Sequence, residues 1–243
     1  MPTAPAADQE RLLAVQDLDT RLQQARHRRD TLPVLATIAD LEGERSELGD
    51  RLVALATEAG DIRREVTKAE DDVQSVRARA DRDRAKLDSG QGSAKDLQAL
   101  QSEVESLAKR QSDLEDVELE AMERLEAADS VLAAAKARAH EIEVAMAAAV
   151  AERTAAFATI DAEIAELEAE RATAAMGIDT GLAALYERLR ASHGGIGAAA
   201  LRGAECQGCH MNVNPGDLAA MQAAGPDEIC RCEECDRILV RGA

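Results

Sequence analysis

Four cysteines in the last forty residues are the side chains whose type and spacing could do chemistry. They form two Cys-x-x-Cys pairs, Cys206 with Cys209 and Cys232 with Cys235, with 22 residues between the pairs. A Cys-x-x-Cys turn directs two thiolates at one ion, and two such turns complete the tetrahedral shell of a structural zinc ion. Because this shell leaves no position for water, we expect the metal to stabilise a fold rather than to catalyse a reaction.

Other roles for these cysteines were weighed against zinc binding. Redox disulfides are disfavoured because no βαβ pattern places a Cys-x-x-Cys motif at the start of a helix. Cys230 could compete with Cys232, since residues at i and i+2 of a strand face the same side. We favour Cys232 because only the Cys-x-x-Cys spacing forms the tight turn, and we expect Cys230 to be a small packed or free thiol. His210 would need a strained geometry to replace Cys209.

The composition indicates long helices rather than a large globular core. Among 243 residues, aromatics make up 1%, namely Phe157 and Tyr186, whereas charged residues make up 31%. Much of the apolar content is alanine, which is typical of coiled coils. The first eight residues lack a basic region followed by an apolar run, and no stretch has the 18 or more apolar residues of a membrane span. We therefore expect a cytoplasmic protein without a membrane segment, in which reduced thiols favour metal over disulfide.

A heptad repeat occupies the middle of the chain. From Val34 to Leu87, apolar residues recur at alternating steps of three and four, and only Arg45 and Asp83 interrupt the seam. A period of 3.5 residues keeps one stripe against a partner helix and predicts a left-handed coiled coil.

A second seam runs from Leu97 to Met146, so the partner helix is in the same chain. Between the seams, residues 88–93 contain two glycines and small polar residues that interrupt a helix, and Ser93 with Asp96 resembles a capping box. When the seams are paired antiparallel, the residue numbers of opposing positions sum to 183 or 184. We therefore predict a mainly α fold built on a long antiparallel coiled-coil helical hairpin with its tip near 88–93.

The root of the hairpin is expected to be irregular. The Leu32-Pro33 pair predicts a kink near 33, and the seam after Met146 shows a stutter. We predict a first helix over 8–31 that packs against the later part of the long helix, and a short helix over 180–191 that carries Tyr186. The packing residues of the first helix are expected to be Leu12, Val15, Leu18 and Leu22.

The C-terminal segment should form a small β zinc ribbon. Residues 193–197 are glycine-rich and are expected to be a flexible boundary. After it we predict a strand over 198–201, the first cysteine turn, an irregular insert with a turn at 214–216, the second cysteine turn and a strand over 237–240. The expected domains are 1–192, the helical hairpin, and 193–243, the ribbon. Metal binding should supply much of the ribbon's folding free energy, about 10 kcal/mol or more.

Four segments of the chain together resemble a bacterial family of C4-type zinc-ribbon coiled-coil proteins, which includes flagellar regulators and type III secretion adaptors. The matching segments are Leu13–Asp19, Lys95–Glu103, Cys206–Met211 and Glu228–Leu239. The resemblance implies a helical hairpin with a four-cysteine zinc ribbon and no catalytic activity. It also implies chaperone or adaptor roles toward a sigma factor or secretion components, and RNA binding in some members. The chain departs from the family pattern at Asp236, where glycine is common, and at residues 90–93, where asparagine and proline are common.

Charge separates the two functional hypotheses, a protein-binding adaptor and a nucleic-acid-binding regulator. The chain has a formal net charge of -18, whereas binding to phosphates needs exposed Lys and Arg. Residues 206–243 contain three arginines and six acidic residues, and four thiolates on one Zn²⁺ add negative charge. We therefore favour an adaptor or regulatory protein that docks cytosolic proteins, with nucleic-acid binding as the alternative.

Basic residues do cluster in two places, near the hairpin tip and in the first helix. Such runs usually form a solvated helix face, and a docking site for nucleic acid or acidic protein is the sharper alternative. No glycine-rich phosphate loop and no His-Glu-x-x-His motif is present, so we expect no enzymatic activity. The seam is also compatible with a homodimer. The two clusters are Arg77, Arg79, Arg82, Arg84, Lys86 and Lys95 near the tip, and Arg21, Arg26, Arg28 and Arg29 in the first helix.

Overall fold

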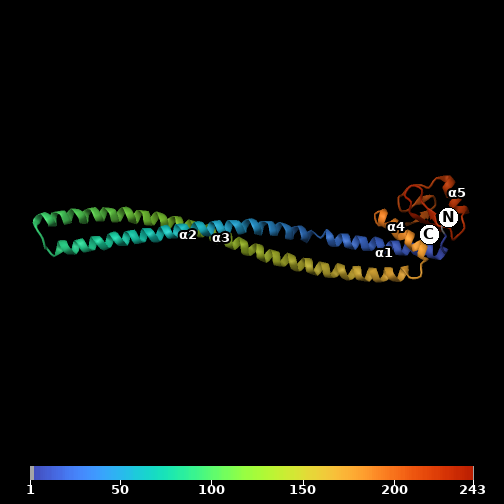
Figure 1. The fold of residues 1–243 in the computed structure, drawn as a ribbon, viewed down its shortest axis with the longest axis horizontal. Helices are drawn as coiled ribbons and strands as arrows, with labels where there is room; N and C mark the ends of the chain where they lie inside the picture. Colours follow the sequence, from blue (N-terminus) through green and yellow to red (C-terminus); the bar gives the residue numbers. More distant parts are fainter. Residues whose placement is uncertain (1–2, 243) are drawn as a thin grey trace. The chain divides into compact units, whose positions relative to one another are not determined.

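The chain is mainly α-helical (Figure 1), as the sequence predicts. It also carries a small sheet near its C-terminal end. A computed structural model describes residues 3–242. The chain divides into two compact units: residues 37–149 form the hairpin unit, and the described residues up to Ala36 together with those from Val150 onward form the head unit. The expected domains placed all residues up to 192 with the hairpin, whereas in the structure both ends of this helical region group with the ribbon.

The hairpin unit consists of parts of two long helices, α2 (Pro33–Asp88) and α3 (Ala94–Ala175), which run antiparallel. Along α2, the seam residues from Val34 to Leu87 are buried or half-buried, with the exception of Arg45. Asp83 occupies a seam position and is buried, where it pairs with Lys86 at 3.1 Å. The heptad pattern therefore identifies the packed face of each helix.

The turn between the helices is closed by the expected capping box. Its two glycines adopt positive φ angles, 64° at Gly90 and 137° at Gly92, which side chains disfavour. The amide of Ser93 donates to Asp96 Oδ2 at 3.1 Å, and the amide of Asp96 donates to Ser93 Oγ at 3.3 Å. The side-chain hydrogen bond from Ser93 lowers the pKa of Asp96. These contacts satisfy the free amides at the start of α3.

Ion pairs between α2 and α3 flank the seam and fix the antiparallel register. In two of the pairs both residues directly follow a seam position, and in the other three both directly precede one. Residues that flank the seam in this way occupy e and g positions, which select partner orientation. Because both side chains of each pair are exposed, each contributes at most about 1 kcal/mol. The pairs are Arg63–Asp129, Arg77–Glu115, Arg79–Glu103, Arg124–Glu65 and Arg138–Glu44.

In the head unit, α1 (Ala6–Asp30) packs on two different surfaces. Leu18 and Leu22 contact Leu167 of α3, as expected. Leu12 and Val15, in contrast, belong to a cluster with α4 (Thr180–Ser192) and the ribbon. Ala174 and Ala175 at the end of α3 also pack on this cluster. The expectation that all four positions pack on the long helix is therefore incomplete for the first half of α1: because α3 ends at Ala175, α4 and the ribbon complete the surface on which Leu12 and Val15 pack.

The basic cluster of α1 is neutralised by acidic residues of α3. Four arginines pair across the two helices at 2.7–3.9 Å, and the Arg29 guanidinium also lies 4.1 Å from the centre of the Phe157 ring. This cluster is consequently an interhelical contact rather than a free basic surface. The pairs are Arg21–Glu170, Arg26–Glu168, Arg28–Glu163 and Arg29–Asp161.

The ribbon is a four-stranded sheet with the order β2-β1-β4-β3. Its strands are β1 (Ala198–Arg202), β2 (Glu205–Cys206), β3 (Cys230–Arg231) and β4 (Ile238–Val240). β1 is antiparallel to β2 and parallel to β4, and β3 is antiparallel to β4. The strands predicted over 198–201 and 237–240 are confirmed as β1 and β4, whereas the two-residue strands β2 and β3 are too short to show a periodicity.

The insert between the cysteine pairs is a helix, α5 (Pro215–Ala223), rather than the expected irregular segment. Asn214 caps it, because its Oδ1 accepts a hydrogen bond from the amide of Gly216 at 2.8 Å. Proline fits the first helical position, where its missing N–H is not needed. The turn predicted at 214–216 is therefore the start of this helix, for which the same residues are also typical.

The segment 193–197 is held in place and is not the flexible boundary that its glycines predict. The carbonyl of Ile196 accepts a hydrogen bond from Arg237 Nε at 3.0 Å. A Cβ atom at Gly197 would lie 2.7 Å from the carbonyl oxygen of Tyr186, so only glycine allows this close approach to α4. The ribbon therefore packs directly on the head helices.

Candidate metal centre

The two cysteine turns bring four thiol groups together. The Sγ atoms of Cys206, Cys209, Cys232 and Cys235 all lie within 4.8 Å of one another. Across the turns, Cys206 and Cys235 are 3.8 Å apart, and Cys209 and Cys232 are 3.9 Å apart. Tetrahedral coordination at a Zn–S distance of about 2.3 Å requires sulfur atoms about 3.8 Å apart. The group therefore has the size and chemistry of a structural zinc site.

Both turns have the same backbone structure. The amide of His210 donates to the carbonyl of Cys206 at 2.8 Å, and the amide of Asp236 donates to the carbonyl of Cys232 at 2.7 Å. In each turn, the residue after the second cysteine has a left-handed conformation, with φ of 61° at His210 and 62° at Asp236. This repetition places the sulfur pairs on opposite sides of one point, as a four-ligand site needs.

The left-handed conformation at position 236 favours glycine and also tolerates aspartate. A Cβ atom is disfavoured in this region, but Asp and Asn can occupy it by local hydrogen bonding. Asp236 does so through Arg231, whose Nη2 contacts its carboxylate and whose Nε donates to its carbonyl at 3.1 Å. The departure from glycine is compatible with an intact turn.

The other candidate ligands lie outside the group. The exposed side chain of His210 is 3.2 Å from Glu205 rather than near the sulfurs. Cys230 is buried in the ribbon core, with its Sγ 4.0 Å from the carbonyl of Glu228. Cys230 and Cys232 are not on the same side of one strand, because β3 ends at Arg231 and Cys232 already belongs to the turn.

The thiols differ in acidity. Burial raises the pKa of Cys206 and raises that of Cys232 to about 12. At Cys235, burial also acts to raise the pKa, but hydrogen bonds from the backbone and side chain of Arg237 outweigh it and lower the pKa to about 7. Zinc binds thiolates, so loading of the site releases protons and strengthens as the pH rises.

Several residues that the sequence does not mark as functional support this site from outside. Arg241 donates to the carbonyls of Met221 at 2.6 Å and Ala224 at 3.0 Å, and thereby closes the loop between the cysteine turns. Gln16 and Asp19 of α1 are buried polar residues that contact the segment leading into β1 and helix α4. Both lie in the Leu13–Asp19 segment, where they interrupt an apolar pattern; that interruption was the available indication.

A helical hairpin and a four-cysteine ribbon in one chain define the class of protein. Residues 15–194 match the CT398-like coiled coil hairpin domain, and residues 206–239 match the C4-type zinc ribbon domain. The chain belongs to the CT398-like coiled-coil hairpin family, and its C-terminal domain is a zinc ribbon whose cofactor is Zn²⁺.

Relatives of similar length occur in mycobacteria. Rv2229c of Mycobacterium tuberculosis is 38% identical over 238 residues, which is 98% of this chain and 97% of that protein. ML1638 of Mycobacterium leprae is 30% identical over 222 residues, which is 91% of this chain and 95% of that protein. A solved structure from Mycobacterium smegmatis has 34% identity and a TM-score of 0.86, covering 99% of this chain and 100% of that one.

More distant solved structures have the same fold. CT398 from Chlamydia trachomatis has 18% identity and a TM-score of 0.70, covering 97% of this chain and 98% of that one. The HP0958 protein from Helicobacter pylori has 14% identity and a TM-score of 0.53, covering 99% of each chain. Within residues 3–242, no helix is long and apolar enough to cross a membrane.

Proposed function

We propose that the protein is a non-enzymatic adaptor or regulatory protein that docks protein partners in the cytoplasm. The supporting observation is the charge of its accessible surface. The chain has a net charge of -18. Most of the clustered Lys and Arg side chains form ion pairs with acidic residues of the same chain. A protein partner with basic and apolar groups fits such a surface better than a polyphosphate does.

The pairing of basic residues extends to all three regions where cations gather. Near the tip, four of the six clustered cations are ion-paired, and the α1 cluster pairs with α3. In the ribbon, Arg231 pairs with Asp236, while Arg237 and Arg241 donate to backbone carbonyls. Within the described residues the fourth ribbon arginine, Arg202, is exposed and has no ion-pair partner. Three of the four ribbon arginines therefore organise the fold, and this supports a protein partner over a nucleic acid.

Exposed apolar side chains in the hairpin unit provide a surface for such a partner. Leu119 and Met122 lie three residues apart on α3, which puts them on neighbouring positions of one helix face. They are 58% and 46% exposed, and five glutamates lie within four residues of one or the other. We propose that this acidic, apolar surface binds a partner segment that combines Lys or Arg with apolar residues. The glutamates are Glu115, Glu118, Glu120, Glu123 and Glu126.

Affinity capture followed by reconstitution tests the adaptor role. The tagged chain is compared with a Leu119→Ser/Met122→Ser variant and with a matched control, Val53→Ser, an exposed apolar residue of α2. A partner lost with the double variant but kept with the control should then form a complex from purified components. The proposal fails if the double variant changes no binding, or if no captured protein binds after purification.

Nucleic-acid binding is the alternative, and one observation favours it. Within the described part of the chain, Arg82 and Lys95 near the tip have no ion-pair partner. Fluorescence anisotropy with RNA and duplex DNA at low and physiological salt separates the two functions. Since phosphate binding weakens steeply with salt, we expect no binding at either concentration. Binding at low salt that is lost in an Arg82→Ala/Lys95→Ala variant would support the alternative.

A further inference from the structure

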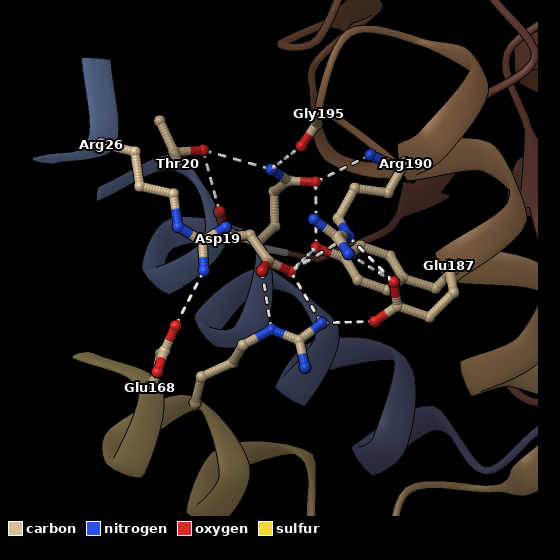
Figure 2. Close-up of polar contacts among 11 residues, drawn as sticks. Asp19, Thr20, Arg26, Glu168, Glu187, Arg190 and Gly195 are labelled. Carbon is tan, nitrogen blue, oxygen red and sulfur yellow. Dashed lines mark hydrogen bonds and ion pairs between the residues drawn. The ribbon is translucent and has the colours of Figure 1, made fainter. Parts of the chain in front are cut away.

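Two buried polar side chains of α1 hold the segment that leads into the ribbon. Gln16 and Asp19 lie three residues apart, on one face of the helix. Gln16 Oε1 accepts hydrogen bonds from the amides of Gly197 at 2.8 Å and Ala198 at 3.3 Å. Its Nε2 donates to the carbonyl of Gly195 at 3.0 Å, a contact drawn in Figure 2. One amide side chain thus satisfies three backbone groups just before β1.

Asp19 connects the same face of α1 to α3 and α4. Its carboxylate accepts two hydrogen bonds from Arg171 of α3, at 2.6 and 3.0 Å. Arg190 and Glu187 of α4 complete the network around it (Figure 2): Arg190 Nε lies 3.6 Å from Asp19 Oδ2, and Glu187 contacts both arginines. The Asp19 side chain is only 4% exposed, so its charge depends on these partners.

Tyr186 joins the two halves of this network. Its hydroxyl donates to Asp19 Oδ2 at 2.7 Å and lies 3.3 Å from Gln16 Oε1. The ring of Tyr186 is buried where α1 and α4 meet strands β1 and β4, in the cluster that contains Ala198 and Ile238. Burial raises the pKa of Tyr186 well above its usual range, and the hydrogen bond to Asp19 raises it further.

The same segment is tied to the metal turns. The amide of Gln207, within the first cysteine turn, donates to the carbonyl of Ala200 in β1 at 3.0 Å. The amide of Ile238, three residues after Cys235, donates to the carbonyl of Gly197 at 3.0 Å. The first turn is therefore connected to Gly197 along the backbone of β1, and the second turn through the hydrogen bond of Ile238; Gly197 in turn bonds Gln16.

We propose that Gln16 and Asp19 form a latch through which the metal state of the ribbon controls the packing of α1 on α3 and α4. The ribbon is too small to keep its strands in place without zinc. Loss of zinc therefore withdraws the amides of Gly197 and Ala198 from Gln16. A buried polar group that loses its partner is costly, so α1 and α4 loosen together with the ribbon and expose Tyr186. Linkage requires the reverse as well: opening the latch weakens zinc binding.

The sequence provides its own reporter for this coupling, because Tyr186 is the only tyrosine and tryptophan is absent. An ordinary tyrosine ionises at about pH 10. In ultraviolet absorbance titration of the zinc-loaded chain, we expect Tyr186 to form no phenolate at that pH. After removal of zinc by a chelator, the titration should shift to about pH 10, while circular dichroism still shows the hairpin helices. A Tyr186 that remains protected in metal-free protein would overturn the latch.

Variants of the latch test the reverse direction. With Gln16→Ala and zinc bound, amide exchange at Gly197 and Ala198 should accelerate about 5- to 30-fold. The zinc dissociation constant should rise by a similar factor. The matched control is Gln24→Ala, an exposed glutamine of the same helix, which should change neither quantity. Wild-type exchange and zinc affinity in Gln16→Ala would contradict the proposal.

A milder pair of variants applies if Gln16→Ala does not fold. Asp19→Asn removes the charge but keeps the size of the side chain, and Asp17→Asn is the exposed control two residues away. We expect Asp19→Asn to lower the pH at which Tyr186 titrates and to weaken zinc binding, whereas Asp17→Asn should do neither. If Asp19→Asn moves the tyrosine titration without any change in zinc affinity, Asp19 is only a local packing residue and the latch is wrong.

Discussion

The hairpin unit and the head unit are stabilised in opposite ways. In the hairpin, the same small contact recurs along two helices: a seam residue every three or four positions and exposed ion pairs beside it. In the head, segments from both ends of the helical region meet in adjoining hydrophobic clusters, around one metal centre and one buried polar network. Stability is therefore spread evenly in the hairpin and concentrated in the head. A single substitution should consequently lower the stability of the head more than that of the hairpin.

Loss of a zinc ligand should have the largest effect and should leave the hairpin intact. Cys206→Ser, Cys209→Ser, Cys232→Ser or Cys235→Ser removes one sulfur from the group, and structural zinc binding supplies about 10–16 kcal/mol in comparable peptides. We expect each variant to lose stoichiometric zinc, measured by elemental analysis, and to unfold the head while circular dichroism retains the hairpin signal. Cys230→Ser is the control and should keep its zinc. Zinc retained by Cys232→Ser but lost by Cys230→Ser would refute the ligand set.

A Leu→Ala substitution in each unit should give the next largest difference in stability. Leu182→Ala in α4 creates a cavity at a fully buried position and should cost about 2–5 kcal/mol. Leu52→Ala in α2 removes a half-buried seam residue and should cost about 1–2 kcal/mol, because less apolar area is lost. Denaturant unfolding followed by Tyr186 fluorescence and by circular dichroism reads the two units separately. Equal losses at both positions would abolish the distinction between them.

Substitution at Asp236 tests whether the left-handed turn needs a special residue. We expect Asp236→Val to lower the stability of the head by about 1–2 kcal/mol, because a β-branched residue is strained at positive φ. Asp236→Gly relieves the backbone and loses only an exposed ion pair with Arg231, so it should stay within about 1 kcal/mol of the parent. Thermal unfolding of zinc-loaded protein makes the comparison. A valine variant as stable as the glycine variant would show that the turn imposes no such constraint.

Ion pairs of the hairpin should have the smallest effect. Arg63→Ala removes the contact with Asp129, in which both side chains are exposed, and should cost about 0.2–1 kcal/mol. The loss should shrink at high salt because exposed charges are screened. Lys68→Ala, an exposed lysine of the same helix, provides the control. A loss above the Leu52→Ala value would mean that charge rather than the seam holds the hairpin together.

The sequence predicted the parts of this fold that depend on neighbouring residues. The heptads identified the seams, and Ser93 with Asp96 marked the start of α3, because helix periodicity and capping act over a few positions. The cysteine spacing likewise predicted the thiol group, since each turn is local. That these four cysteines are the zinc ligands stays a prediction, which the serine variants test.

The head was harder to predict because its contacts join distant positions. Nothing near Gln16 indicates that it bonds Ala198, 182 residues away, and nothing near Leu12 indicates that it packs on α4 and the ribbon. The glycines of 193–197 suggested flexibility for the same reason: Gly197 is required by the carbonyl of Tyr186, which lies in another element. The Asn-Pro-Gly error at α5 differs, because two local structures share this sequence: a turn and the start of a helix.

The convergence of both chain ends in the head has a consequence for synthesis on the ribosome. Once α3 has emerged, the hairpin can close and the second half of α1 can pack on it, but the first half of α1 finds its ribbon partners only after more of the chain has been made. Gln16 and Ala198 are separated by 182 residues, which corresponds to about 10–40 s at translation rates of about 5–20 residues per second. Until the ribbon has been made, the first half of α1 lacks these partners. The newborn chain is then most exposed to chaperones and proteases, and zinc capture by the last residues ends that period.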